Sequence, residues 1–193
     1  MMVFIAFAVI IGLAQRYKGA EIYRHAATGI ELPRTIGSYY RGEISPYDEK
    51  SADPAESIEY RSPHTNVTIY IRRMSPGSKD TAADVVAQSL AVIKLLNQFS
   101  DIQASKVTSP DGKPEWKEVM FYGRANGHQV LSYIDCRIKQ GYAIKVRATT
   151  DEAMNFSLRA FLQAIQDRVD SAAPLAEPTS SPPHSSASDL PKP

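Results

Sequence analysis

The chain has 193 residues, of which 43% are hydrophobic and 22% charged, which is enough to bury one hydrophobic core of ordinary size. Its 22 basic and 21 acidic residues leave a formal net charge of +1, so no overall field favours nucleic acid, anionic lipid or another polyanion. The one cysteine, Cys136, excludes an intramolecular disulfide and a multi-cysteine metal site.

The N-terminus, MMVFIAFAVIIGLAQRYKGA, has no polar side chain from Met2 to Ala14. This length suits the apolar part of a secretion signal, about 7–15 residues, better than a membrane-crossing helix of about 20. Small residues around Gly12 suit cleavage, whereas Arg16 and Lys18 suit a retained anchor. We expect residues 1–27 to be a signal or anchor with its linker, and residues 1–14 to meet the membrane. Cleavage stays open, as do a start upstream of Met1 and a buried core element.

Residues 28–170 are expected to form one globular domain. The segment 171–193 is dense in Pro and Ser, cannot bury enough surface to offset its ordering entropy, and is predicted to be a disordered tail. ELPRTIGSYYRGEISPY, with Pro33 and Gly42, predicts a first strand with a bulge. In SIEYRSPHTNVTIYIRR apolar and polar residues alternate on both sides of a turn at 62–66, which predicts a hairpin.

Two segments have the apolar period of a helix. In DTAADVVAQSLAVIKLLNQF, Thr81 and Asp84 are spaced like a capping box, and one broad apolar face runs to Phe99. That face contains Ala82, Val85, Val86, Leu90, Val92, Ile93, Leu96 and Phe99. In TTDEAMNFSLRAFLQAIQDRV the apolar stripe consists of Met154, Leu158, Phe161, Leu162, Ile165 and Val169.

Three strand candidates lie between these helices. They are EWKEVMFYG, VLSYIDCRI and YAIKVRAT, joined by turns at Asn126–Gly127 and at 139–141. The element order is therefore β-β-β-α-β-β-β-α. We expect an α+β fold, in which an antiparallel sheet of about six strands is packed by two amphipathic helices.

The last two strands supply the candidate binding surface. Ile134 and Cys136 on one strand, and Ile144 and Val146 on the next, are expected to share the inward face. The outward face is then a basic and aromatic patch of Tyr133, Asp135, Arg137, Lys139, Lys145 and Arg147. It could meet an acidic partner or a glycan if no helix covers it. The alternative is a solvated face with cross-strand charge pairs.

The strand and helix order, with ELPRTIGSYYRG leading and YAIKVRATT running into the last helix, resembles the PsbP-like fold and its small bacterial exported members. The resemblance covers about Leu32 to Val169. It implies a mostly non-catalytic superfamily, in which some members serve the photosystem, one assists nuclear transport, and many bacterial members are lipoproteins or exported proteins. A lipobox cysteine is missing here, so the lipoprotein variant is not implied, and no functional residues are transferred.

Other chemistry finds little support. The loop around Lys79 lacks the spacing of a phosphate-binding loop, and no two histidines sit at metal-ligand spacing, so neither a metal nor a cofactor is expected. Cys136 could be a nucleophile only if a base lay beside it. His128 begins the same strand and is too far away, so His25 or His64 would have to arrive from elsewhere. A small buried core thiol is the favoured interpretation.

Three function hypotheses follow. The first is a non-catalytic accessory or protein-binding module, exported or tethered at the membrane, whose partner is an unknown protein or envelope component and not nucleic acid. The second is an enzyme that uses Cys136 as a reactive thiol. The third is a cytosolic assembly or transport cofactor, which the resemblance also allows.

Overall fold

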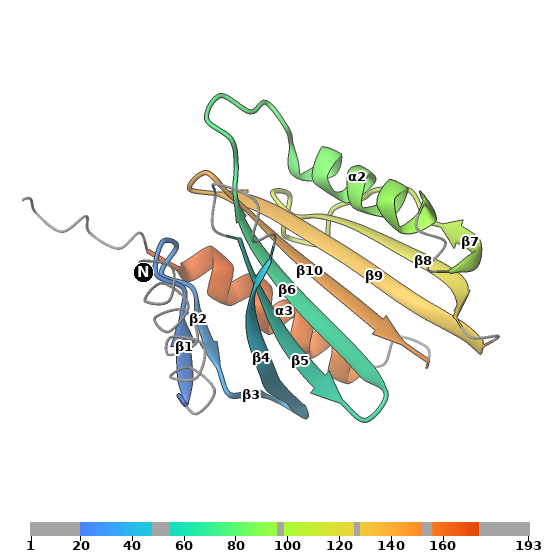
Figure 1. The fold of residues 1–193 in the computed structure, drawn as a ribbon, viewed down its shortest axis with the longest axis horizontal. Coiled ribbons are helices and arrows are strands. Elements are labelled where there is room, and N and C mark those ends of the chain that lie inside the picture. The colour runs from blue at the N-terminus through green and yellow to red at the C-terminus, as the bar shows by residue number, and fades with distance from the viewer. Residues whose placement is uncertain (1–19, 48–54, 96–98, 126–127, 152–155, 174–193) are drawn as a thin grey trace, which may run out of the picture.

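The computed structural model describes residues 20–47, 55–95, 99–125, 128–151 and 156–173 (Figure 1). In chain order its elements are β1 (Ile22–Arg24), β2 (Glu31–Pro33), β3 (Thr35–Ile36), β4 (Tyr39–Tyr47), β5 (Ala55–Ser62), β6 (Thr65–Arg73), α2 (Ala82–Leu95), β7 (Ser100–Ala104), β8 (Lys117–Ala125), β9 (His128–Lys139), β10 (Tyr142–Thr150) and α3 (Phe156–Ser171). The predicted α+β class, with a large antiparallel sheet and two helices, is confirmed.

The predicted count of six strands is wrong. The main sheet has eight strands in the order β3-β4-β5-β6-β10-β9-β8-β7, and β1 and β2 form a separate two-stranded sheet. The strands that were missed, β1, β2, β3 and β7, are two to five residues long. Such short segments contain too few alternations for a period of two to stand out.

The sheet joins two antiparallel ribbons that are distant in sequence. The predicted β5–β6 hairpin and the predicted β8–β9–β10 meander both form, and β10 pairs with β6 along its whole length. The last strand therefore lies in the middle of the sheet. Gln140 and Gly141 have φ values of 54° and 75° at the β9–β10 turn, where the second position suits glycine.

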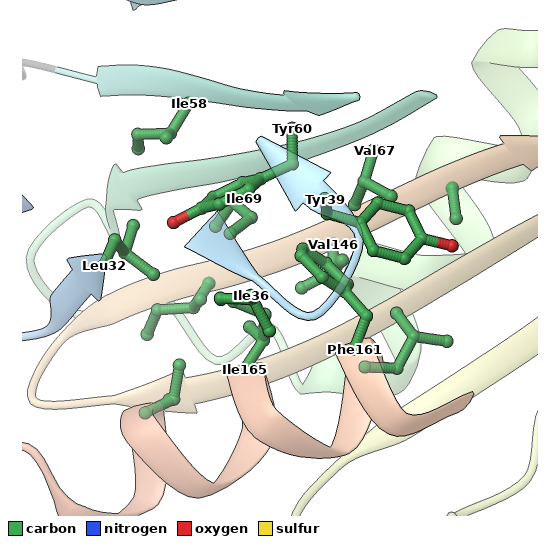
Figure 2. Close-up of a cluster of buried hydrophobic side chains, with 14 of the residues drawn as sticks. Leu32, Ile36, Tyr39, Ile58, Tyr60, Val67, Ile69, Val146, Phe161 and Ile165 are labelled. Carbon is green, nitrogen blue, oxygen red and sulfur yellow. The ribbon is translucent and has the colours of Figure 1, made fainter. Parts of the chain in front are cut away.

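The two helices pack against opposite faces of this sheet. The larger cluster of buried residues contains the apolar face of α3 and side chains of β5, β6 and β10, and Figure 2 shows Phe161 and Ile165 pointing from α3 toward the strands. The smaller cluster joins Val85, Val86 and Ile93 of α2 to β8 and β9. Tyr133 belongs to the first cluster and Ile134 to the second. Because neighbouring side chains of a strand point to opposite faces, β9 is buried on both sides.

The helices follow the sequence prediction with two differences. Thr81 and Asp84 do form a capping box: the Thr81 N–H donates to Asp84 Oδ2 at 2.8 Å and the Asp84 N–H donates to Thr81 Oγ1 at 3.3 Å. However, α2 ends at Leu95, so Phe99 lies outside it, and Val92 is 52% exposed rather than inward. In α3 the described residues of the predicted stripe are all buried, whereas Met154 lies outside the described residues. Neither described helix is long and apolar enough to span a membrane.

The described packing includes residues before Thr28, the expected start of the domain. Tyr23 is buried in the larger cluster, and Arg41 of β4 donates to the carbonyl oxygens of Ala20 and Leu32. Gly29 has a φ of 69°, and a side chain there would meet the carbonyl oxygen of Ala173 at 2.4 Å. The described segments at both ends of the chain therefore meet on the α3 side of the sheet.

The α3 interface generates a first prediction. The Phe161 ring lies 4.4 Å from Tyr39 and 5.2 Å from Tyr60 between ring centroids and is 1% exposed. We expect Phe161→Ala to lower the free energy of unfolding by about 3–5 kcal/mol, because it removes buried area and leaves a cavity. Phe156→Ala is the matched control, since Phe156 is 87% exposed on the same helix. Equal losses in urea denaturation would contradict this packing.

Candidate functional site

The six residues predicted to form one outward patch lie on two faces of the sheet. In the β9–β10 register Cys136 pairs with Lys145, Asp135 with Val146 and Arg137 with Ile144. Paired residues share a face, so Tyr133, Asp135, Arg137 and Lys139 point to the α3 side, and Lys145 and Arg147 point to the α2 side. The prediction that these six residues share one outward face is wrong, because the assumed register was shifted by one residue.

On the α3 side, the β9 residues hold the helix in place. Gln166 Nε2 donates to Asp135 Oδ2 at 2.7 Å, and Arg137 pairs with Asp170. Lys139 Nζ donates to the carbonyl oxygens of Val169, Asp170 and Ala172 at 2.6–2.8 Å. A cation at the C-terminus of a helix satisfies carbonyl groups that lack intrahelical partners and interacts favourably with the helix dipole.

Asp170 joins the end of α3 to a second segment of the chain. Its carboxylate accepts hydrogen bonds from Trp116 Nε1 at 2.9 Å and from Lys113 Nζ at 2.6 Å, in addition to the pair with Arg137. Trp116 is fully buried and follows the loop that leads into β8. These contacts fix α3 over β8 and β9, so the β9 side chains on this face belong to an internal interface.

On the α2 side, the remaining two predicted residues lie against aromatic rings. Lys145 Nζ lies 4.5 Å from the centroid of the Tyr70 ring and 3.3 Å from Ser89 Oγ of α2, and burial lowers the pKa of this lysine. The Arg147 guanidinium lies 5.6 Å from the Phe99 ring. Both cations are half-buried where α2 borders the rest of the sheet.

Beyond these two cations, the same face of β4, β5 and β6 forms the open sheet face. We define it by Tyr40, Glu59, Arg61, Asn66, Thr68, Tyr70, Arg72, Lys145 and Arg147, which share one side in the strand register. Tyr40 is 64% exposed, and Arg61 and Arg72 are exposed as well. Arg61 also contacts Glu59 at 2.5 Å. A hollow of about 420 Å³ lies between β5 and β6 on this part of the sheet.

A second hollow, the α3 pocket, also has a volume of about 420 Å³. It is lined by Thr108, Ser109, Pro110, Asp111, Glu118, Met120, Tyr133, Arg159, Leu162, Gln163 and Gln166. Glu118 accepts a hydrogen bond from the Tyr133 hydroxyl and pairs with Asp135 across the β8–β9 ladder. The sequence prediction missed this pocket. The one feature of the sequence that indicates this pocket is Gln166, a polar residue that lies four positions after Leu162 on the buried stripe of α3.

Asp135 is the most strongly perturbed acid beside the α3 pocket. It is fully buried, and its Oδ1 has no hydrogen-bond partner within the described ranges. Burial raises the pKa of Asp135 to about 7, the Gln166 hydrogen bond opposes this rise, and the charge of Glu118 adds to it. The carboxyl group therefore keeps its proton to a higher pH than an ordinary aspartate does.

Cys136 has the environment of a core thiol. It is completely buried in the cluster beneath α2, and burial raises the pKa of the thiol to about 12, with a further contribution from Asp135. His25 cannot act as its base, because His25 lies on the α3 side, where Nδ1 is 2.9 Å from Thr28 Oγ1 and the ring contacts Tyr142. Across the part of the chain that the structure describes, no group of His, Cys, Asp or Glu could hold a metal ion.

Comparisons with known proteins give remote structural likeness only. No family model and no curated protein matches the chain. The extracellular domain of PknH from Mycobacterium tuberculosis has 11% identity and a TM-score of 0.40, over 69% of this chain and 85% of that one. PA94 from Pseudomonas aeruginosa, described as a protein of unknown function and putative regulator, has 14% identity and a TM-score of 0.36, over 80% of this chain and 96% of that one. A GTP binding regulator, TM1622 from Thermotoga maritima, has 10% identity and a TM-score of 0.30, over 70% of this chain and 77% of that one. No function follows from likeness at this level.

The pKa of Asp135 predicts the pH dependence of stability. The folded chain keeps this proton up to about pH 7, whereas an aspartate with the ordinary pKa of 3.8 loses it earlier. The contribution of this group to the free energy of unfolding is therefore complete below pH 3.8 and declines as the pH rises to about 7.

We expect the stability of Asp135→Asn relative to the wild type to rise across this interval, by roughly 1.4 kcal/mol for each pH unit. Urea denaturation at pH 4, 6 and 8 measures it, with exposed Asp80→Asn as control. A difference that stays constant with pH would contradict the assignment.

The environment of Cys136 predicts its reactivity. Ellman's reagent should modify the native thiol orders of magnitude more slowly than the thiol of the same protein unfolded in guanidinium chloride, because the native group is buried and protonated. Equal rates in the two states would instead restore the hypothesis of a reactive thiol.

Proposed function

We propose that the chain is a non-catalytic binding module, exported or tethered at the membrane through residues 1–14, and that its open sheet face binds an acidic segment of a partner protein. The single observation that carries the proposal is the exposure of Tyr40, Arg61 and Arg72 on a part of the sheet that lies beside α2.

The charge of the open sheet face favours an acidic partner. Arg61 and Arg72 extend into solvent, and Lys145 and Arg147 add positive charge behind them, whereas Glu59 is the one acid among the residues that define the face. Guanidinium groups bind carboxylates through two parallel hydrogen bonds, and an exposed tyrosine adds contact area at low entropy cost. The net charge of the whole chain is only +1, so attraction would be local to this face.

One feature supports the tethered or exported location. It is the apolar run from Met2 to Ala14, which is typical of a signal or an anchor. The resemblance to the PsbP-like fold is part of the same proposal.

Charge reversal tests the open sheet face. We expect the full chain to bind a fluorescent poly-glutamate peptide more weakly as salt rises, and the double variant Arg61→Glu with Arg72→Glu to lose at least about tenfold in affinity. Arg124→Glu is the control, because Arg124 is an exposed cation of β8 outside this face. Fluorescence anisotropy measures the affinity. Equal binding by the double variant and the control would show that the open sheet face is not the binding site. Tighter binding to anionic vesicles than to the peptide would indicate an envelope component in place of a protein partner.

Fractionation of native cells tests the location separately. Recovery of the chain in the membrane or extracytoplasmic fraction is expected, and recovery entirely in soluble cytosol would contradict the tether. Intact mass and N-terminal sequencing of the recovered protein distinguish a cleaved from a retained segment.

A further inference from the structure

The α3 pocket lies on the other side of the sheet from the open sheet face, and its lining includes two acidic residues, Asp111 and Glu118. Glu118 contributes a carboxylate that already accepts one hydrogen bond, from Tyr133. The Gln163 amide donates a hydrogen bond to the Asp167 carboxylate at 2.8 Å, and the Gln166 amide donates one to the Asp135 carboxylate at 2.7 Å. Each contact occupies one of the two N–H donors of the amide and fixes the orientation of the side chain.

A second carboxyl group lies next to Glu118, outside the lining of this pocket. Glu118 and Asp135 are directly paired on neighbouring strands, so their Cβ atoms are roughly 5 Å apart, and Gln166 of the lining hydrogen-bonds the second acid. Asp135 is buried and does not line the pocket, so Glu118 is the member of this pair that a ligand can meet. Two neighbouring carboxyl groups repel when both are charged. A ligand that brings positive charge to Glu118 relieves this repulsion.

We infer that the α3 pocket binds a small ligand through an ammonium or guanidinium group, with Glu118 as its principal acceptor. Such groups carry three and five donors respectively. The volume of about 420 Å³ suits a small molecule, and Leu162 and Met120 supply apolar contact for its carbon chain. Arg159, the one cation of the lining, is exposed and can pair with an anionic group of the same ligand.

Calorimetry with agmatine tests this site on the full chain. Agmatine should bind, whereas butyrate and glycerol should not, and L-arginine should bind as well, since Arg159 of the lining is a cation that its carboxylate would meet favourably. The same groups could be presented by a protein, so a lysine-rich peptide is the second arm. Binding of the peptide but not of agmatine would overturn a small-molecule site.

Two variants make the test specific. Glu118→Gln keeps an acceptor for the Tyr133 hydroxyl but removes the charge, and should weaken agmatine by about tenfold or more. Glu56→Gln is the matched control, because Glu56 also accepts a hydrogen bond from a tyrosine, Tyr23, on the same side of the sheet but outside the pocket. Equal weakening by the two variants would contradict the assignment.

An NMR titration of the wild type keeps the inference testable if Glu118→Gln does not fold. Changes in amide signals should concentrate at 108–111, 118–120 and 159–166, the segments that line the pocket. The absence of changes at about 10 mM agmatine, or changes confined to the open sheet face, would overturn the inference.

Discussion

The central constraint of this fold is that β9 is covered by a helix on each face. Ile134 and Cys136 are apolar and pack beneath α2, whereas Asp135 and Arg137 are polar and point toward α3. Buried polar groups must find partners, because each one left unpaired costs free energy. The position of α3 is therefore specified by hydrogen bonds and ion pairs as well as by the apolar contacts of Phe161.

Both candidate binding regions are consequences of this arrangement. α2 packs over β8 and β9, so the part of the same face on β4–β6 keeps exposed tyrosine and arginine side chains. On the other face α3 is held at its C-terminal end by Asp170, while its earlier turns, with Arg159 and Gln163, form one wall of the α3 pocket. The two regions therefore lie on opposite faces of the sheet, and each has its own side-chain composition: arginine and tyrosine on the open sheet face, and Glu118 with Arg159 and Gln163 in the α3 pocket.

The sequence predicted the elements that have a long periodic pattern of apolar residues. It did not predict the features that depend on how the strands pair. The helices, the β5–β6 hairpin and the β8–β10 meander follow from apolar spacing, and the capping box follows from Thr81 and Asp84. The side of β9 that faces each helix could not be predicted, because both sets of alternate residues are buried. The alternation of side chains along the strand therefore does not indicate which set faces solvent. The α3 pocket was equally inaccessible, since it requires the pairing of Glu118 with Asp135 and the position of Gln166 above them.

The most direct measurement of the central claim uses the single tryptophan of the chain, whose indole N–H gives one resolved NMR signal. This proton donates to Asp170 at the end of α3. Our account predicts that it is protected from exchange with solvent and shows nuclear Overhauser effects to the Asp170 side chain. Rapid exchange, or contacts to Val86 of α2 instead, would contradict the polar attachment of α3 on which the α3 pocket depends.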